Sequence, residues 1–299
     1  SGDIAGDDKI LARVVDSYRR IRNTLRFLLA NTSDFDANKD AVAPEQMLEI
    51  DRYALARAAQ LQAEIVGTLN PASGTFSGGH YGVYEFHPVV AKLQLYCSED
   101  LGAFYLDILK DRLYTTPPKS LARRSAQTAL WHITHAFVRW MAPFLSFTAE
   151  EAWHVFQPDG SASVFMQTYW ALPEPDSALL AKWQRIREIR DVANREIEAV
   201  RSAGQLGSSL QAELTLDVNA ADRSLLQTLG DDLKFITITS GASLFDAAEL
   251  AVRVAPSSAP KCERCWHYRD DVGRDGAHPT ICGRCTANLF GAGEVRTVA

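Results

Sequence analysis

The sequence predicts a mainly α-helical fold in three parts: an antiparallel helical bundle, a small α+β domain and a short cysteine-held ribbon at the C-terminal end. Apolar residues recur at helical spacing through roughly the first 160 residues. After Pro173–Pro175 they alternate as in strands, and two Cys-x-x-Cys pairs follow. We therefore predict domains at residues 1–175, 176–259 and 260–299.

Helical periodicity defines the bundle. The first helix has its apolar stripe at Ile10, Val14, Ile21, Leu25 and Leu28. Further helical segments are predicted near residues 44–69, 86–114 and 130–141, with a Gly- and Pro-rich loop at 70–79. The segment Thr148–Glu151 has the pattern of a capping box before one more helix. Four residues are expected in the core: Cys97, Trp131, Trp140 and Trp153.

The α+β domain is predicted to begin with a charged helix over residues 177–203, which ends at Gly204. Alternating apolar residues predict a strand at 214–218. Further strands are expected at 235–238 and 250–254, and a short helix at 222–229.

The cysteine pairs have the spacing of a metal site. Cys262 and Cys265 are separated from Cys282 and Cys285 by sixteen residues, so four thiolates can surround one Zn²⁺ at about 2.3 Å per sulfur. Four sulfurs complete the tetrahedral coordination of zinc and leave no position for water, which predicts a structural metal. Two alternatives remain: a pair of disulfides, or replacement of one sulfur by His267 or His278.

The charge distribution is uneven. The chain has a net charge of −6, which argues against indiscriminate coating of nucleic acid. Basic residues nevertheless gather at 9–30, where Arg19, Arg22 and Arg26 share one helix face, and at 110–124, which includes Arg123 and Arg124. This pattern is typical of a selective polyanion binder, although each run alone is also compatible with a solvated helix face.

Apolar runs are too short for a membrane span, and the first residues do not have the pattern of a signal peptide. With reduced cysteines, this predicts a cytoplasmic protein without a membrane partner.

Four segments together resemble the C-terminal part of bacterial isoleucyl-tRNA synthetases, in family order: Ser17–Asn31, Phe104–Arg112, Met141–Glu151, and Lys261–Tyr268 with Cys282–Cys285. The resemblance implies an anticodon-binding bundle and a zinc module that bind isoleucine tRNA. The class I signature motifs and an editing domain are absent, and we expect both to precede Ser1 in the same polypeptide. ATP and Mg²⁺ would then serve only the full-length enzyme, a monomer, and this part alone would be catalytically inactive.

The tRNA-binding residues expected from these patterns are Arg19, Arg22, Arg26, Arg123, Arg124, Arg264 and Trp266. Trp266 follows the first knuckle, and either stacks on an unpaired base or packs within the module. Arg264 either reaches RNA or offsets the negative zinc–thiolate centre, a role that suits Arg284 even better. His132 and His135 are expected to be bundle residues, and no catalytic residue is predicted.

Two other functional classes compete. Zinc ribbons of this spacing also resemble those of formamidopyrimidine-type DNA glycosylases, which would make the module a DNA binder. Those enzymes begin with a nucleophilic proline, whereas this chain begins with Ser1 and devotes about half its length to helices. We therefore expect no DNA partner. A protein-interaction scaffold is the third class, which tRNA binding across a salt titration would distinguish from the first.

Overall fold

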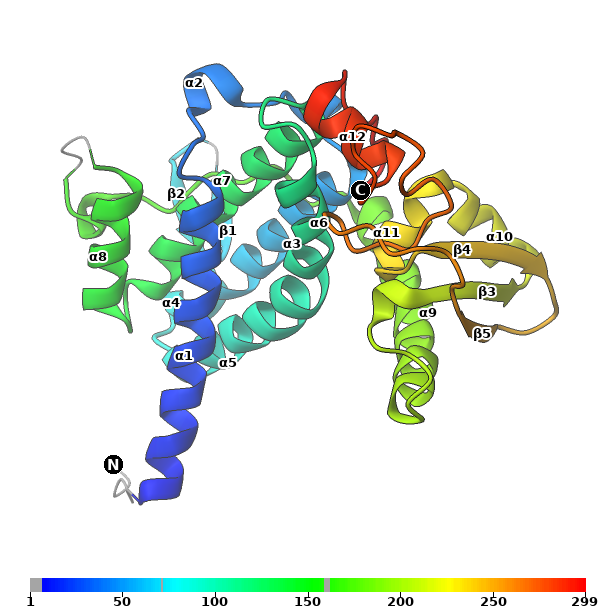
Figure 1. Ribbon diagram of the computed structural model, residues 1–299. Helices are drawn as coiled ribbons and strands as arrows, with labels where there is room; N and C mark the ends of the chain where they lie inside the picture. Colours follow the sequence, from blue (N-terminus) through cyan, green and yellow to red (C-terminus); the bar gives the residue numbers. More distant parts are fainter. Residues whose placement is uncertain (1–6, 71, 159–161) are drawn as a thin grey trace. The chain divides into compact units, whose positions relative to one another are not determined.

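A computed structural model describes residues 7–70, 72–158 and 162–299 of the chain (Figure 1). The predicted fold class is confirmed: helices dominate, a small sheet lies in the C-terminal half, and four cysteines cluster near the end. No helix in the described part has the length and apolar character needed to cross a membrane.

The chain forms two compact units. Unit 1 comprises Ser1–Ala41, Ala54–Asp107 and Gln127–Pro175, and unit 2 comprises Val42–Tyr53, Ile108–Ala126 and Asp176–Ala299. The division into domains at 1–175, 176–259 and 260–299 stays a prediction.

Unit 1 is helical. It contains α1 (Asp8–Asn31), α2 (Ala37–Asp40), most of α3 (Glu49–Ile65), α4 (Gly79–Gly82), α5 (Phe86–Leu95), the π-helix η2 (Tyr96–Tyr105), most of α7 (Leu121–Met141), α8 (Ser146–Phe156) and the 3₁₀ turn η3 (Val164–Met166). The Asp7 carboxylate caps α1 by accepting a hydrogen bond from the Ile10 amide at 2.7 Å. Leu28 and Phe137 are fully buried, as expected for apolar residues at helical spacing, whereas Ile10 and Val14 at the start of the first predicted stripe are 42% and 60% exposed. Trp140, Trp153 and Cys97 are also buried as predicted, whereas Trp131 is only half-buried.

Unit 2 joins the long helix α9 and several short helical pieces to a three-stranded sheet. It contains η1 (Pro44–Gln46), α6 (Leu106–Thr115) from Ile108 onward, α9 (Ser177–Ser202), η4 (Ser209–Gln211), β3 (Ala212–Val218), α10 (Ala220–Gln227), η5 (Gly230–Asp232), α11 (Leu233–Thr237), β4 (Gly241–Asp246), β5 (Ala251–Pro256) and α12 (Gly283–Phe290). The strand order is β4-β3-β5, with β3 parallel to β4 and antiparallel to β5.

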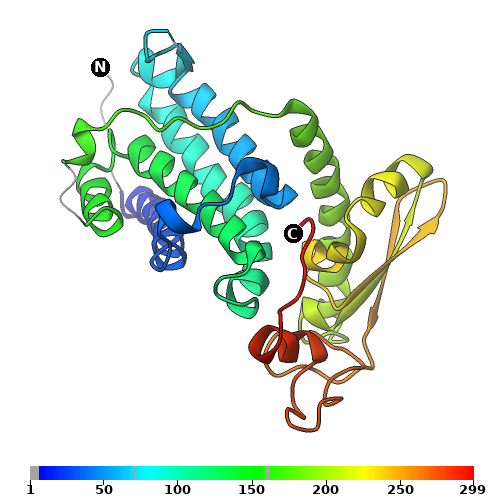
Figure 2. The same cartoon turned by 90° about the horizontal axis from the view of Figure 1, so that it is seen from above.

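The helix α9 packs along this sheet (Figure 2). Its apolar face meets the alternating inward residues of β3 in one cluster, formed by Ala193, Ile197, Leu206, Ala212 and Leu214. Burial alternates along β3, as the sequence pattern predicts for a strand with one covered face.

Three local predictions differ from the structure: the strand at 235–238, the capping box at Thr148–Glu151 and the irregular loop at 70–79. Residues 235–238 are not a strand: Phe235, Ile236 and Thr237 end the helix α11, because a short buried apolar run suits a helix and a strand equally. The helix α8 begins at Ser146 without a side-chain cap, and the Thr148 hydroxyl instead lies 3.2 Å from the Tyr18 hydroxyl.

The predicted loop after residue 69 also contains regular structure. A short antiparallel hairpin joins β1 (Thr68–Asn70) to β2 (Thr75–Ser77), although Pro71 lies outside the described residues. Gly67 and Gly79 flank it with positive φ, and a Cβ on either would lie within 2.5 Å of backbone atoms.

Candidate metal centre and nucleic-acid interface

The four cysteines come from two knuckles of different local structure. Cys262 and Cys265 lie in a tight turn, in which the Trp266 amide donates to the Cys262 carbonyl at 2.9 Å. Cys282 precedes the first turn of α12, and Cys285 lies within that turn. The positive end of a helix favours thiolates at this position. A single bridge between Lys261 and Tyr268 supplies the ribbon's pairing.

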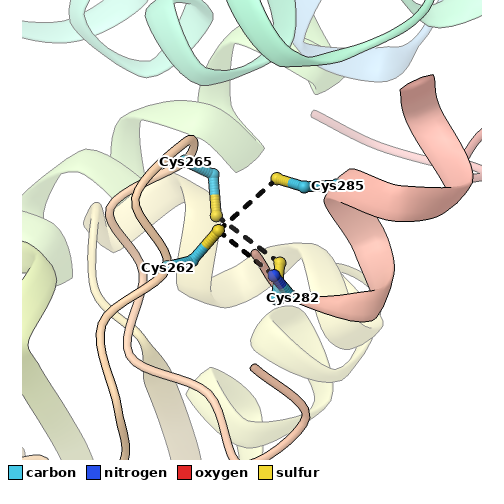
Figure 3. A group of neighbouring side chains, drawn as sticks. All are labelled: Cys262, Cys265, Cys282 and Cys285. Carbon is cyan, nitrogen blue, oxygen red and sulfur yellow. Dashed lines mark hydrogen bonds between the residues drawn. The ribbon is translucent and has the colours of Figure 1, made fainter. Parts of the chain in front are cut away.

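The sulfur geometry fits one tetrahedral cation. All four sulfurs lie within 4.8 Å of one another (Figure 3). The Cys262–Cys285 and Cys265–Cys282 sulfur pairs are separated by 3.8 and 3.7 Å. Four sulfurs at about 2.3 Å from a zinc ion would stand about 3.8 Å apart, whereas a disulfide needs about 2.05 Å. The cysteines are free thiols, so the disulfide alternative is wrong and the site fits a structural Zn²⁺.

The thiols also form hydrogen bonds with one another, and these bonds shift their pKa values. Hydrogen bonding to Cys265 and Cys285 lowers the pKa of Cys282 to about 3. Hydrogen bonds with Cys265 and Cys282 raise the pKa of Cys285. These two pKa values shift in opposite directions because the neighbouring sulfurs share protons. A zinc ion in place of those protons would remove the difference, because zinc binds the thiolate form of every cysteine.

Neither histidine belongs to this cluster. A ring nitrogen of His267 lies 3.2 Å from the Cys265 carbonyl oxygen, and the His278 ring stacks on Phe290 at 4.1 Å. The four cysteines therefore complete the candidate ligand set on their own.

A buried ionic cluster adjoins the second knuckle. The Asp111 carboxylate accepts two hydrogen bonds from Arg284, at 2.7 and 2.8 Å, and another from Arg296. Glu294 lies 3.4 Å from Arg284. Burial raises the pKa of Asp111. The hydrogen bonds and charge of Arg284, together with the charge of Arg296, have a larger opposite effect, so the pKa lies well below its ordinary value. Arg284 is thus a buried residue whose counter-ions are Asp111 and Glu294. Its expected role in offsetting the zinc–thiolate centre stays a prediction.

Trp266 is presented to solvent. Its residue is 60% exposed and its backbone has a φ of +66°, a conformation that non-glycine residues seldom adopt. The Lys261 ammonium lies 5.8 Å from the indole ring. The interpretation that packs Trp266 inside the module is therefore wrong, because most of the residue is exposed to solvent.

Arg264 is half-buried beside the end of α6. Its guanidinium donates to the Thr115 carbonyl at 2.9 Å and to the Tyr114 carbonyl at 3.5 Å. These bonds hold the first knuckle against that helix terminus. A direct RNA contact by Arg264 stays a prediction.

The other expected tRNA contacts fall in two places. Arg22 and Arg26 are exposed on α1 in unit 1, as is Arg19, which pairs with Asp16 at 3.4 Å. Arg123 and Arg124 are half-buried in the first turn of α7, within unit 2. Their RNA contacts likewise stay predictions.

The basic run at 110–124 is weaker at the surface than its sequence indicates. Arg112 is fully buried and pairs with Asp51, so it cannot belong to a surface patch. Tyr114 is not among the stacking residues expected from the sequence, although an aromatic residue within a basic run is a usual signal for one. Tyr114 is exposed at the end of α6, and its carbonyl accepts a hydrogen bond from Arg264.

His132 and His135 lie among aromatic rings in unit 1. The His135 ring stacks on Trp170 at 3.9 Å, and desolvation lowers its pKa to about 3, so it is neutral at physiological pH. His132 accepts a hydrogen bond from the Trp170 indole at 3.0 Å. Their expected role as bundle residues agrees with these contacts.

Two family profiles match the chain. Residues 77–216 match the "Anticodon-binding domain of tRNA ligase". Residues 260–288 match the "Zinc finger found in FPG and IleRS". The second profile is shared with the glycosylases, but the first is not, so the DNA-glycosylase alternative is not favoured.

Relatives match the whole chain. The isoleucine–tRNA ligase of Cupriavidus taiwanensis is 58% identical over 307 aligned residues, those of Ralstonia pickettii and Burkholderia ambifaria 57% and 56%. Each alignment covers 100% of this chain but only 30–31% of the relative. The chain thus spans less than a third of these proteins. It belongs to the isoleucine–tRNA ligase family, as the part that carries an anticodon-binding domain and the zinc finger.

Proposed function

We propose that this chain is the tRNA-binding part of an isoleucine–tRNA ligase and that it holds the anticodon stem and loop of isoleucine tRNA. The observation that carries the proposal is the exposed Trp266 indole, which the first zinc knuckle presents beside Lys261. Unstacked anticodon bases are commonly read by stacking on aromatic planes. The anticodon-binding profile over residues 77–216 supports the same assignment.

Phosphate contacts would supply most of the affinity. The exposed Arg22 and Arg26 on α1 can follow a phosphate backbone, because guanidinium groups bind phosphate in pairs of hydrogen bonds. Arg19, Arg123, Arg124 and Arg264 complete the proposed set. Since the net charge is −6, repulsion elsewhere on the surface would restrict RNA to these positions.

The complete ligase would join isoleucine to its tRNA with ATP and Mg²⁺, as a monomer in the cytoplasm. Those steps belong to the catalytic and editing domains of the same polypeptide. We expect this chain alone to show no isoleucine-dependent ATP–pyrophosphate exchange above background.

Trp266→Ala tests the proposal. We expect tRNA affinity to fall by about 1–3 kcal/mol, or roughly five- to 150-fold, with unchanged zinc content. Val295→Ala is the matched control, since Val295 is an even more exposed apolar residue of the same tail. Equal affinity of Trp266→Ala and the parent chain would refute base stacking, and loss of zinc in proportion to affinity would show a structural role instead.

A further inference from the structure

A cavity of about 340 Å³ opens at the C-terminal end of α7, within unit 1. Its lining comes from Arg139, Ala142 and Pro143 at the end of that helix and from the segment 164–169, which includes η3. Its volume lies in the range of small-molecule sites, about 300–1,000 Å³. None of these residues belongs to the tRNA-binding set proposed above, so the cavity is a separate feature of the chain.

Arg139 supplies the charge of this cavity. The residue is 7% exposed, and its guanidinium donates to the Thr168 carbonyl at 2.8 Å and to the His135 carbonyl at 2.7 Å. The guanidinium carbon also lies 4.6 and 5.3 Å from the ring centres of Trp153 and Trp170. These contacts fix the guanidinium group in place, but none of them carries a negative charge.

Among the described residues, no carboxylate pairs with Arg139. Arg112 and Arg284 are buried to a similar degree, and each pairs with an aspartate, Asp51 or Asp111. Burial alone lowers the pKa of Arg139 to about 10, because no negative charge opposes the loss of solvation. A buried charge without a counter-ion is costly, and an anion in the cavity would supply one.

The rest of the lining is mainly apolar. Ala142, Pro143, Val164 and Phe165 contribute carbon surface, and Tyr169 adds an aromatic ring. Within the part of the chain that the structure describes, no aspartate or glutamate lines the cavity. A bound cationic group would therefore find no carboxylate to receive it.

The carboxylate of Glu150, on the next helix α8, is bound elsewhere. It accepts hydrogen bonds from the Ser163 hydroxyl at 2.9 Å and the Val164 amide at 3.0 Å, and it lies 3.1 Å from the His154 ring. Glu150 thus holds the start of η3 and does not neutralise Arg139. The missing negative charge must come from a ligand.

We propose that this cavity binds a small organic carboxylate with an apolar body and no ammonium group. The carboxylate pairs with Nη2 of Arg139, which has no hydrogen-bond partner among the described residues. The apolar body contacts Val164, Phe165 and Tyr169. Phe165 is 55% exposed without a ligand, so binding would also remove apolar surface from water.

An RNA phosphate fits this cavity less well. Phosphate contacts are usually made by arginines and lysines on the surface, where the nucleic-acid backbone can reach them. Arg139 is almost fully buried, and its surroundings are apolar rather than basic. A compact molecule can enter such a site more easily than a polymer backbone can.

Three probes of similar size test the proposal on the zinc-loaded 299-residue chain: 3-phenylpropanoate, its neutral amide and phenylalanine. The indole N–H resonances of Trp153 and Trp170 report on the cavity, because these rings flank Arg139. We expect only 3-phenylpropanoate to shift them, with a Kd of about 0.1–1 mM. Equal binding of the amide or of phenylalanine, or no shift at about 10 mM carboxylate, would overturn the proposal.

Variants then locate the contact. Arg139→Met removes the charge and should weaken 3-phenylpropanoate about tenfold or more. Arg57→Met is the matched control and should leave the Kd unchanged, because Arg57 is also largely buried in unit 1 but pairs with Asp100 at 3.1 Å. Ala142→Leu keeps Arg139 and fills part of the cavity, so it should weaken the probe even if Arg139→Met does not fold. An unchanged Kd in either cavity variant contradicts the assignment.

Added tRNA separates the two kinds of anion. A carboxylate site apart from the RNA surface should keep its Kd when tRNA is present, and Ala142→Leu should bind tRNA as the parent chain does. Displacement of the probe by tRNA, or weaker tRNA binding by Ala142→Leu, would identify an RNA phosphate as the occupant and overturn the proposal. The tRNA affinity of Trp266→Ala tests the proposed function independently.

Discussion

Asp111→Asn is the sharpest test of how the zinc module is held. Asp111 lies on α6, and its carboxylate neutralises Arg284 of the second knuckle and Arg296 of the tail. The side chains of these arginines are only 6% and 1% exposed. Asparagine keeps the size of the side chain but removes the charge, so two buried guanidinium groups lose their main counter-ion.

The expected cost follows from that burial. Removing one partner of a buried ion pair typically costs about 3–5 kcal/mol. Glu294 remains 3.4 Å from Arg284 and 3.1 Å from Arg296, so we expect the lower end, about 3 kcal/mol. Asp217→Asn is the matched control, because Asp217 also pairs with an arginine, Arg253, whose side chain is 65% exposed. Such a surface pair is worth about 0–1 kcal/mol.

Urea unfolding of zinc-loaded protein, followed by circular dichroism, measures both variants, with zinc content determined on the same samples. Because the folded pKa of Asp111 lies below its unfolded value, its contribution is complete above about pH 5 and decreases as the pH falls below the ordinary Asp pKa of about 3.9 toward the lower folded pKa. Asp111→Asn should remove that part of the acid dependence. A loss no larger than that of Asp217→Asn would refute the reasoning.

Three further predictions concern metal, RNA and thiol chemistry. Purified chain should contain one equivalent of zinc, and its chelation should unfold the tail but not the helical bundle, because zinc supplies about 10–16 kcal/mol to small modules; less than half an equivalent in freshly purified protein would contradict this. Arg22→Ala should lower the salt dependence of tRNA binding by about 0.7–0.9 log units per log of salt, and an unchanged slope would exclude a phosphate contact. Burial raises the pKa of Cys97 to about 12, so a thiol reagent at pH 8 should leave it unmodified in zinc-loaded protein and modify it only after unfolding. Rapid modification of the folded chain would show that this segment opens.

Chemistry that depends on short sequence spacing was predictable. The two Cys-x-x-Cys pairs determine the ligand set, since four thiolates at that spacing leave few other geometries. The helical period of α1 and the alternation of β3 were also predictable, because each reflects which side of one element can face a core. The anticodon-binding assignment came from motif resemblance rather than from periodicity.

Tertiary structure decided what joins residues that are distant in sequence. Asp111 and Arg284 are 173 residues apart, so no local pattern relates them, and only packing shows that this arginine is buried rather than basic surface. Tertiary context also overrode two local signals. Residues 233–237 are buried as a helix, and the Thr148 hydroxyl lies near the Tyr18 hydroxyl of α1 rather than capping α8. Whether Trp266 is covered depended on how the tail folds around it, and the exposure of Ile10 and Val14 depended on how far the neighbours of α1 extend. Periodicity identifies an apolar face, but only the positions of the neighbouring elements determine whether that face is already covered.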